Sequence, residues 1–321
     1  MTRHPPADPI SAPGPRHAFD ALRKSRLRLA LGMICGLLPS FAAAAESATD
    51  TLAKIAATRT ITIGYREAAA PFSYQQPDGS IIGYSIDLCL KIAESVQKHL
   101  GLDSLKVDYV VSSAATRFVL VKSGKVDLEC TTTTNNAERR QQVDFAYPHF
   151  ITATRFVSLK KNDIDSITDL AGRSVVSTTG TVNVEQLNSL NRNLGLNIQV
   201  LLAKQHAEAF AMVESGKAYA FVMDGILLAD LVASSKKPAD FALSTDTFGP
   251  PEPYGIMLPR GDAAFKSVVD GTLQQIYTGN DIKAIYAKWF LSPIPPDGRN
   301  LNLPMSPAIE AAFRAPAEYR D

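Results

Sequence analysis

Residues 129–140, with the sequence ECTTTTNNAERR, determine how the rest of the chain is interpreted. They follow a short apolar run at 126–128 that is typical of a strand, and they lead into a segment of helical character. Four threonines and two arginines at a strand end bring hydroxyls, free backbone N–H groups and guanidinium groups together, which suits the binding of a small carboxylate. A turn rich in threonine and asparagine is the simpler interpretation.

On both sides of this stretch, segments typical of strands alternate with segments typical of helices. The first set comprises strands at 60–65, 106–111 and 126–128, with helices at 85–100 and 113–123. The second set comprises strands at 174–177, 198–202 and 218–223, with helices ending at 190, 215 and 233. A strand at 254–259 and helices at 263–277 and 281–290 follow. This alternation predicts an α/β fold with parallel or mixed sheets and right-handed crossovers.

The order of the segments predicts two lobes, the first of which is built from both ends of the chain. Extended segments around 146–157 and 248–258 would cross between the lobes and form a hinge, and a cleft between lobes is a preferred ligand site. The expected boundaries are 46–152 plus 251–299 for lobe 1, 153–250 for lobe 2 and 300–321 for a C-terminal tail.

Residues 1–45 have the composition of a signal peptide with an N-terminal extension. A basic segment at 23–28 precedes an apolar run at 29–38, and small residues continue to Ala45. A membrane-spanning helix would need about 20 apolar residues, so we expect export to the periplasm with cleavage after Ala45. Beyond this residue the formal net charge is −3, whereas the whole chain carries +1. This near balance argues against nucleic-acid binding.

Two cysteines, Cys89 and Cys130, remain after the expected cleavage. They are too few for a disulfide framework or a cysteine metal cluster. A single disulfide between them is possible in an oxidising compartment, but we expect two buried free thiols.

Polar residues collect at the expected strand ends, where open parallel sheets bind their ligands. They are Arg66, Ser112, Ser113, Thr132, Thr134 and Arg139 in the first set and Thr178, Thr179, Thr181, Lys204, Gln205, His206 and Asp224 in the second, with Arg117 one helical turn beyond Ser113. This collection contains no acid–base pair, no nucleophile paired with histidine and no metal cluster. We therefore expect a binding site without catalytic residues, metal or cofactor.

Several of these residues also have simpler interpretations. Asp224 could cap the helix that follows it, and Arg66 could pair with Glu67 on the surface. His206 could be an ordinary residue at the start of a helix. Arg140 is expected to be solvated, because neighbours on a helix point apart.

Several pieces of sequence occur in a familiar order: GYSIDL at 83–88, the stretch at 130–139, VMD at 222–224 and KWF at 288–290. From about residue 52 to 319 the chain resembles bacterial periplasmic binding proteins for polar amino acids. More narrowly, YRE at 65–67, TTNNAER at 133–139 and AKQH at 203–206 make it similar to the glutamate/aspartate-binding components of ABC importers. The resemblance implies a two-lobed, type II-like fold, a monomer without enzymatic activity, L-glutamate or L-aspartate as ligand, and a permease partner in the inner membrane.

The resemblance also implies roles at the amino-acid end of the ligand. Arg139, helped by Thr134 and by backbone N–H groups near Thr181, would hold the α-carboxylate in a bidentate pair. Asp224 and Thr132 would accept hydrogen bonds from the α-ammonium group.

At the other end, Arg66, Arg117 and His206 would face the side-chain carboxylate, with Thr178 or Thr181 assisting. Three arginines and one aspartate give the site a charge of +2, and a dicarboxylic amino acid contributes −1. A neutral amino acid would leave a guanidinium buried and unpaired, at a cost of several kcal/mol.

Two positions depart from the pattern of the family subgroup. Ala114 stands where a serine is common, and Ser113 could replace its hydroxyl. Ile256 stands where a cysteine is often found, so the usual partner of Cys130 is absent. The alternatives are a dehydratase-like enzyme of the same fold, a protein for a neutral amino acid such as glutamine, and a receptor sensor domain with a retained membrane segment.

Overall fold

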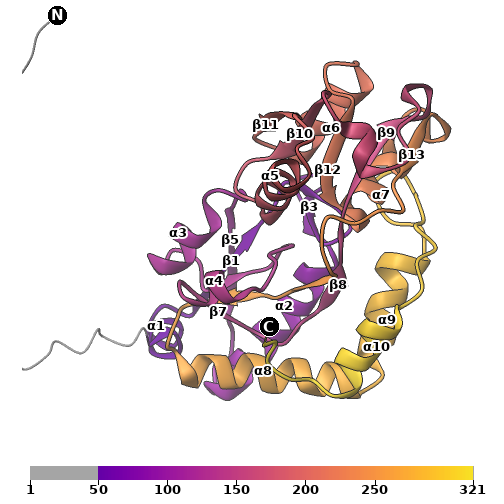
Figure 1. Ribbon diagram of the computed structural model, residues 1–321. Coiled ribbons are helices and arrows are strands. Elements are labelled where there is room, and N and C mark those ends of the chain that lie inside the picture. Colours follow the sequence, from indigo (N-terminus) through magenta and orange to yellow (C-terminus); the bar gives the residue numbers. More distant parts are fainter. Residues whose placement is uncertain (1–49, 321) are drawn as a thin grey trace, which may run out of the picture. The chain divides into compact units, whose positions relative to one another are not determined.

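The computed structural model describes residues 50–320 (Figure 1). The predicted signal peptide and its cleavage site at Ala45 lie outside the described residues. Within residues 50–320, no helix combines the length and the apolar character needed to cross a lipid bilayer.

The first of two five-stranded sheets has the strand order β5-β1-β6-β15-β7. Its strands are β1 (Thr60–Tyr65), β5 (Lys106–Val111), β6 (Leu128–Glu129), β7 (Asp144–Phe145) and β15 (Met257–Leu258). β1 runs parallel to β5 and β6, whereas β15 is antiparallel to β6 and β7. In β1, the fully buried Ile61 and Ile63 alternate with the partly exposed Thr60 and Thr62, as the alternation of β-branched residues predicts.

The second sheet has the strand order β11-β10-β12-β9-β13. Its strands are β9 (Thr154–Leu159), β10 (Ser174–Thr178), β11 (Gln199–Ala203), β12 (Ala220–Asp224) and β13 (Phe241–Leu243). β10 runs parallel to β11 and β12, and β9 is antiparallel to β12 and β13. Both sheets are therefore mixed, and the predicted α/β class is confirmed.

Helices cover both sheets (Figure 1). The α-helices are α1 (Thr51–Thr58), α2 (Tyr84–His99), α3 (Arg117–Lys122), α4 (Ala137–Arg140), α5 (Val182–Leu194), α6 (His206–Glu214), α7 (Gly225–Ser234), α8 (Ala263–Thr278), α9 (Asp281–Tyr286) and α10 (Pro307–Arg314). Shorter helical turns span Lys160–Asn162, Ile167–Leu170 and Pro238–Asp240, and a π-helical turn at Ala287–Leu291 follows α9. In α2, Leu88, Ile92 and Val96 recur at every fourth position and are fully buried, which gives the helix its inner face.

Some expected boundaries differ from the observed ones. The helix expected at 113–123 begins at Arg117, because Ser113 and Thr116 form a hydrogen-bonded turn before it. The strand expected at 126–128 is observed as the two-residue β6, which begins two residues later and ends one residue later. The strand expected at 254–259 is divided into β14 (Glu252–Tyr254) and β15.

Two short strands lie between the sheets along the chain. β8 (Phe150–Thr152) pairs with β14 in antiparallel register, so that Phe150 is opposite Tyr254. Near them, β2 (Ala68–Ala69), β3 (Ser73–Gln75) and β4 (Ile81–Ile82) form a separate small sheet. The strands of each large sheet fall inside the residue ranges predicted for one lobe, and the exact lobe boundaries remain a prediction.

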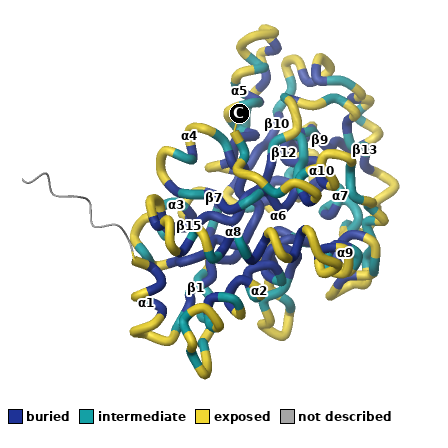
Figure 2. The backbone as a smooth tube through the Cα atoms, turned by 90° about the horizontal axis from the view of Figure 1, so that it is seen from below, coloured by how far each residue is buried: buried dark blue, intermediate teal, exposed yellow. Residues whose placement is uncertain are grey.

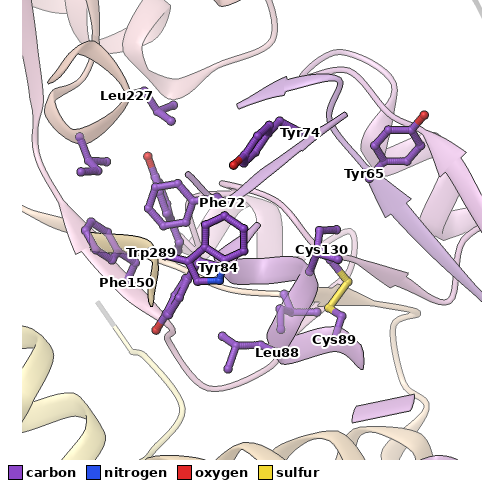
Figure 3. Close-up of a cluster of buried hydrophobic side chains, with 14 of the residues drawn as sticks. Tyr65, Phe72, Tyr74, Tyr84, Leu88, Cys89, Cys130, Phe150, Leu227 and Trp289 are labelled. Carbon is purple, nitrogen blue, oxygen red and sulfur yellow. A yellow bond between two sulfur atoms is a disulfide. The ribbon is translucent and has the colours of Figure 1, made fainter. Parts of the chain in front are cut away.

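Buried segments fill the interior of residues 50–320 (Figure 2), and their apolar side chains form one large cluster and two smaller ones. Phe72 belongs to the large cluster, with ring centroids 4.9 Å from Phe150 and 5.9 Å from Tyr84 (Figure 3). Phe150 belongs to β8, so the crossing strand is anchored in the same aromatic cluster as the start of α2.

The expectation of two free thiols is wrong, because Cys89 and Cys130 form a disulfide (Figure 3). Cys89 lies in α2 and Cys130 directly follows β6, and packing of the helix on the sheet brings their Cα atoms to 6.3 Å. This separation is within the range that disulfides require. A cysteine at position 256 is therefore unnecessary for pairing Cys130.

The predicted C-terminal tail is packed against the rest of the molecule. Ile309 and Phe313 of α10 are buried, and Phe313 stacks near Tyr277 of α8. Before α10, Arg299 forms a bidentate ion pair with Asp230 of α7, with N···O distances of 2.7 and 3.1 Å. The tail therefore packs on α8, and Arg299, the residue just before it, is bound to α7.

Candidate functional site

A small cavity lies beyond the strand ends of both large sheets, and we call it the site cavity. It is lined by Arg66, Arg117, Thr132, Thr134, Arg139, Thr181, Val182, Asn183, His206, Met223 and Asp224. Eight of the nine residues predicted from the sequence are in this set. The ninth, Thr178, lies behind His206. The parallel strands β1, β10 and β12 explain the convergence, because their carboxyl ends open onto the cavity.

Arg139 projects from the single turn of α4, whose start is capped by Asn136. The Asn136 side chain accepts a hydrogen bond from the Arg139 backbone N–H at 3.0 Å. The Arg139 guanidinium donates to the carbonyl of Thr134 at 3.0 Å and lies over the ring of Phe118. Burial, followed by the nearby charge of Arg117, lowers the pKa of Arg139 to about 9. The guanidinium therefore stays positively charged at neutral pH.

Asp224 ends β12 and stands before α7, but its side chain makes no capping hydrogen bond. The capping interpretation is therefore wrong. One carboxylate oxygen accepts from Asn183 Nδ2 at 2.8 Å, and the other accepts a short hydrogen bond from the Tyr254 hydroxyl. Burial raises the pKa of Asp224, and these two hydrogen bonds counteract the rise. A carboxylate offers about four acceptor positions, so Asp224 can still accept from a cationic ligand group.

His206 is the first residue of α6 and is fully buried. Its Nδ1 atom lies 2.9 Å from the hydroxyl of Thr178, and its Nε2 atom has no hydrogen-bond partner within the described residues. Burial, with the charges of Arg66 and Arg117, lowers the pKa of His206 well below its ordinary value, so the ring is neutral. In the tautomer in which Thr178 donates to Nδ1, Nε2 carries the hydrogen and is a donor for an anion in the cavity.

Arg66 follows β1 directly, and it is only 2% exposed. The surface pair with Glu67 is therefore the wrong interpretation of this residue. One guanidinium nitrogen lies 3.4 Å from the side-chain oxygen of Gln205, which precedes α6. Burial, followed by the charge of Arg117, lowers the pKa of Arg66 to about 10, and the group remains charged at neutral pH.

Arg117 begins α3 and is also 2% exposed. Its Nη1 atom donates to the hydroxyl of Thr133 at 2.7 Å, and its Nη2 atom lies 3.4 Å from the carbonyl of Gly180. Its Nε atom is buried without a hydrogen-bond partner among the described residues. Burial lowers the pKa of Arg117. The guanidinium thus has donor capacity directed at the cavity.

Glu129 is the important charged residue that the sequence interpretation missed, although it is the first residue of the stretch 129–140, which we call the decisive stretch. It is fully buried and accepts hydrogen bonds from the hydroxyls of Thr131 and Thr133. With Asp224 it places two carboxylates against three guanidinium groups. The second carboxylate lowers the buried charge from the +2 that the sequence predicted to +1, since the neutral His206 adds no charge.

Three further residues of the site region were also missed. Asn183 lies in the first turn of α5, and Tyr254 belongs to β14. Phe118 lies beneath two guanidinium groups, at 5.5 Å from Arg117 and 5.4 Å from Arg139. No sequence motif marks these residues, because their roles depend on contacts between segments that are far apart in the chain.

The suggestion that Ser113 replaces a missing serine hydroxyl is wrong. Ser113 bonds to Thr116 within its own turn and does not line the site cavity. Ala114 is buried, and its backbone faces Gly180 in the turn after β10. At position 114, where the family subgroup commonly has a serine, the backbone is therefore in close contact with the turn that follows β10.

Comparisons with known proteins are consistent with this geometry. The chain matches the model of the bacterial extracellular solute-binding proteins, family 3, over residues 61–292. It is 44% identical over 294 residues to the L-glutamate/L-aspartate-binding protein of Pseudomonas aeruginosa, covering 90% of this chain and 96% of that protein. It is 38% identical over 291 residues to the glutamate/aspartate import solute-binding protein of Escherichia coli, covering 90% of this chain and 95% of that protein.

Solved structures share the fold. An ancestral arginine-binding protein bound to arginine matches with a TM-score of 0.64 and 28% sequence identity, covering 72% of this chain and 98% of that one. The family resemblance and the fold class expected from the sequence are both confirmed.

Proposed function

The chain belongs to the bacterial extracellular solute-binding proteins of family 3, and on that premise we propose that it captures L-glutamate or L-aspartate for an ABC importer. The ligand lies in the site cavity. Arg139 and Thr134 hold the α-carboxylate, with backbone N–H groups near Thr181, and Asp224 and Thr132 hold the α-ammonium group. The relatives from Pseudomonas aeruginosa and Escherichia coli, whose names include glutamate and aspartate, support this choice.

The observation that carries the proposal is the charge of the buried cavity and its division into two ends. Arg139 and Asp224 form an end that complements the zwitterionic part of any amino acid. Arg66 and Arg117, with the neutral His206, form an end that complements an anion. The total of +1 matches the −1 of glutamate or aspartate, so the closed site becomes neutral. Glutamine would leave one positive charge buried without a counter-charge, which is unfavourable in a low-dielectric interior.

A screen of amino acids by thermal shift and calorimetry tests this proposal. We expect L-glutamate and L-aspartate to stabilise the protein, by about 2.7 kcal/mol at a ligand concentration of 100 times Kd. L-glutamine should bind about a hundredfold more weakly or worse, because it leaves a buried guanidinium without an anionic partner. Stabilisation by glutamine or a basic amino acid, with none by the two acidic ones, would make the assignment untenable.

The accompanying mechanism is closure of two lobes about the crossing strands β8 and β14. The lobes are residues 46–152 plus 251–299 and residues 153–250. Export to the periplasm, cleavage after Ala45, a monomeric state and delivery to an inner-membrane permease complete the proposal. An enzyme of the same fold is the less favoured alternative. An enzyme would need an acid or a base in the site cavity that is free to act on a substrate. Asp224 is the acid among the residues that line the cavity, and its carboxylate is already needed for the ammonium group.

Gly180 provides a test of the closure. A Cβ atom at this position would lie 2.9 Å from the backbone of Ala114 and Ala115, so Gly180→Ala obstructs the closed arrangement. We expect about a tenfold loss of glutamate affinity, since side-chain overlap with fixed backbone costs about 1–3 kcal/mol. Gly172→Ala is the matched control, because its φ of +69° resembles the +80° of Gly180 and no atom lies within 4 Å of its Cβ. Equal affinities of the two variants would show that the contact does not limit closure.

A further inference from the structure

Beneath Arg117, a chain of hydrogen bonds leads to a carboxylate that does not line the site cavity. Arg117 Nη1 donates to the hydroxyl of Thr133 at 2.7 Å, and this hydroxyl donates to Glu129 Oε2 at 2.7 Å. The other oxygen of Glu129 accepts from the hydroxyl of Thr131 and, at 3.4 Å, from that of Ser112. Hydroxyl groups therefore provide hydrogen bonds to both carboxylate oxygens of Glu129.

The direction of this chain is determined by the chemistry of its members. A guanidinium can only donate and an ionised carboxylate can only accept, so the single hydroxyl hydrogen of Thr133 must point to Glu129. A lone pair of the same oxygen then faces Arg117. The carbonyl of Thr133 is held in place by the backbone N–H of Gly255 at 3.0 Å, so the hydroxyl projects from an anchored backbone.

The interposed hydroxyl matters because of what a direct ion pair would do. A carboxylate in contact with Arg117 would take both nitrogens of its planar fork, as bidentate pairs do. Thr133 instead uses one N–H group and leaves the remaining donors, including the unpartnered Nε, for another acceptor. The negative charge of Glu129 still partly balances the positive charge of the three buried guanidinium groups. It does so without occupying the guanidinium of Arg117, which the ligand needs.

We propose that Thr133, oriented by Glu129, is a specificity-determining residue that positions Arg117 for the side-chain carboxylate of the ligand. The inference rests on the proposed function, because it assigns an acidic side chain to the Arg117 end of the site cavity. Thr133 acts through Arg117 and does not itself line the cavity. It is therefore a positioning residue, and its removal should change discrimination between glutamate and glutamine and not merely stability.

Three variants at two neighbouring positions test the proposal by calorimetry with L-glutamate and L-glutamine. Thr133→Val removes the hydroxyl and should lower glutamate affinity about tenfold, the usual effect of one hydrogen bond to a charged group. Glutamine affinity should change little, so the affinity ratio should also fall about tenfold. Thr133→Ser restores the hydroxyl and should recover the wild-type ratio. Thr131→Val is the matched control, since Thr131 also donates to Glu129 but makes no contact with Arg117.

The outcomes separate a positioning role from a structural one. Both valine variants should lower the unfolding temperature, because Thr133→Val leaves one buried Glu129 oxygen without a donor and Thr131→Val leaves the other with only the 3.4 Å contact to Ser112. Only Thr133→Val should change the ratio. An unchanged ratio in Thr133→Val, or an equal fall in Thr131→Val, overturns the proposal. If Thr133→Val does not fold, Thr133→Ala removes the same hydroxyl and is read in the same way. Failure of the wild-type protein to prefer glutamate would instead count against the proposed function.

Discussion

Replacing Arg139 by alanine is expected to lower the affinity for L-glutamate about a thousandfold, the equivalent of about 4 kcal/mol. Arg139 is 8% exposed and its guanidinium donates to the carbonyl of Thr134, which leaves further N–H donors for a carboxylate. Loss of the guanidinium would leave the α-carboxylate of the ligand buried without its bidentate partner. Isothermal calorimetry on the wild type and the variant measures the difference.

Arg140→Ala is the control for this prediction, because it removes the same charge from the next residue. Arg140 does not line the site cavity; its guanidinium bonds to Asn135 at 2.9 Å and lies over the ring of Tyr319. We expect its replacement to change glutamate affinity by about threefold or less, since long-range charge effects are screened by salt. The ligand-free Arg139→Ala protein should remain folded, because the variant removes a desolvated charge. Retention of tight binding by Arg139→Ala would refute the assigned role.

The sequence was a good guide to the site wherever a residue follows a strand. Asp224 ends β12, Arg66 directly follows β1 and Thr132 is the third residue after β6, and these strand ends meet at one cavity by the geometry of parallel sheets. Strand boundaries can be inferred from local patterns of β-branched residues, so such positions are accessible without a structure. The alternation of strands and helices predicted the α/β class for the same reason.

The residues that the sequence did not reveal are those whose roles depend on a partner elsewhere. Glu129 was within the quoted stretch, but a buried carboxylate can be distinguished from an exposed one only when its donors, Thr131 and Thr133, are seen to face it. Asn183 and Tyr254 reach Asp224 from separate segments. The disulfide was missed because pairing requires the distance between α2 and the end of β6, which no local pattern contains.

Removing the disulfide by the double substitution Cys89→Ala and Cys130→Ala is expected to lower the free energy of unfolding by about 4 kcal/mol. The two cysteines are separated by 41 residues in the sequence, and breaking a cross-link over a loop of this length gives the unfolded chain much more conformational freedom. Urea denaturation of the two proteins, each without ligand, measures the difference. The wild type denatured in the presence of a reductant should approach the stability of the double variant, whereas the double variant should not respond to the reductant.

The same two proteins also show whether the disulfide acts on the site. Cys130 immediately precedes the threonines of the decisive stretch, so the cross-link could either constrain only the unfolded chain or hold Thr132 and Thr134 in place. If it acts through the unfolded chain, glutamate stabilises both proteins by the same increment, because that increment depends only on ligand concentration and Kd. We expect this result, because hydrogen bonds hold the backbone of the stretch without help from the disulfide. The carbonyl of Thr131 accepts from the hydroxyl of Ser85, and the carbonyl of Thr133 accepts from the backbone N–H of Gly255. A smaller increment in the double variant would mean that the cross-link positions the threonines, and a loss of stability below about 1 kcal/mol would contradict the loop-closure estimate.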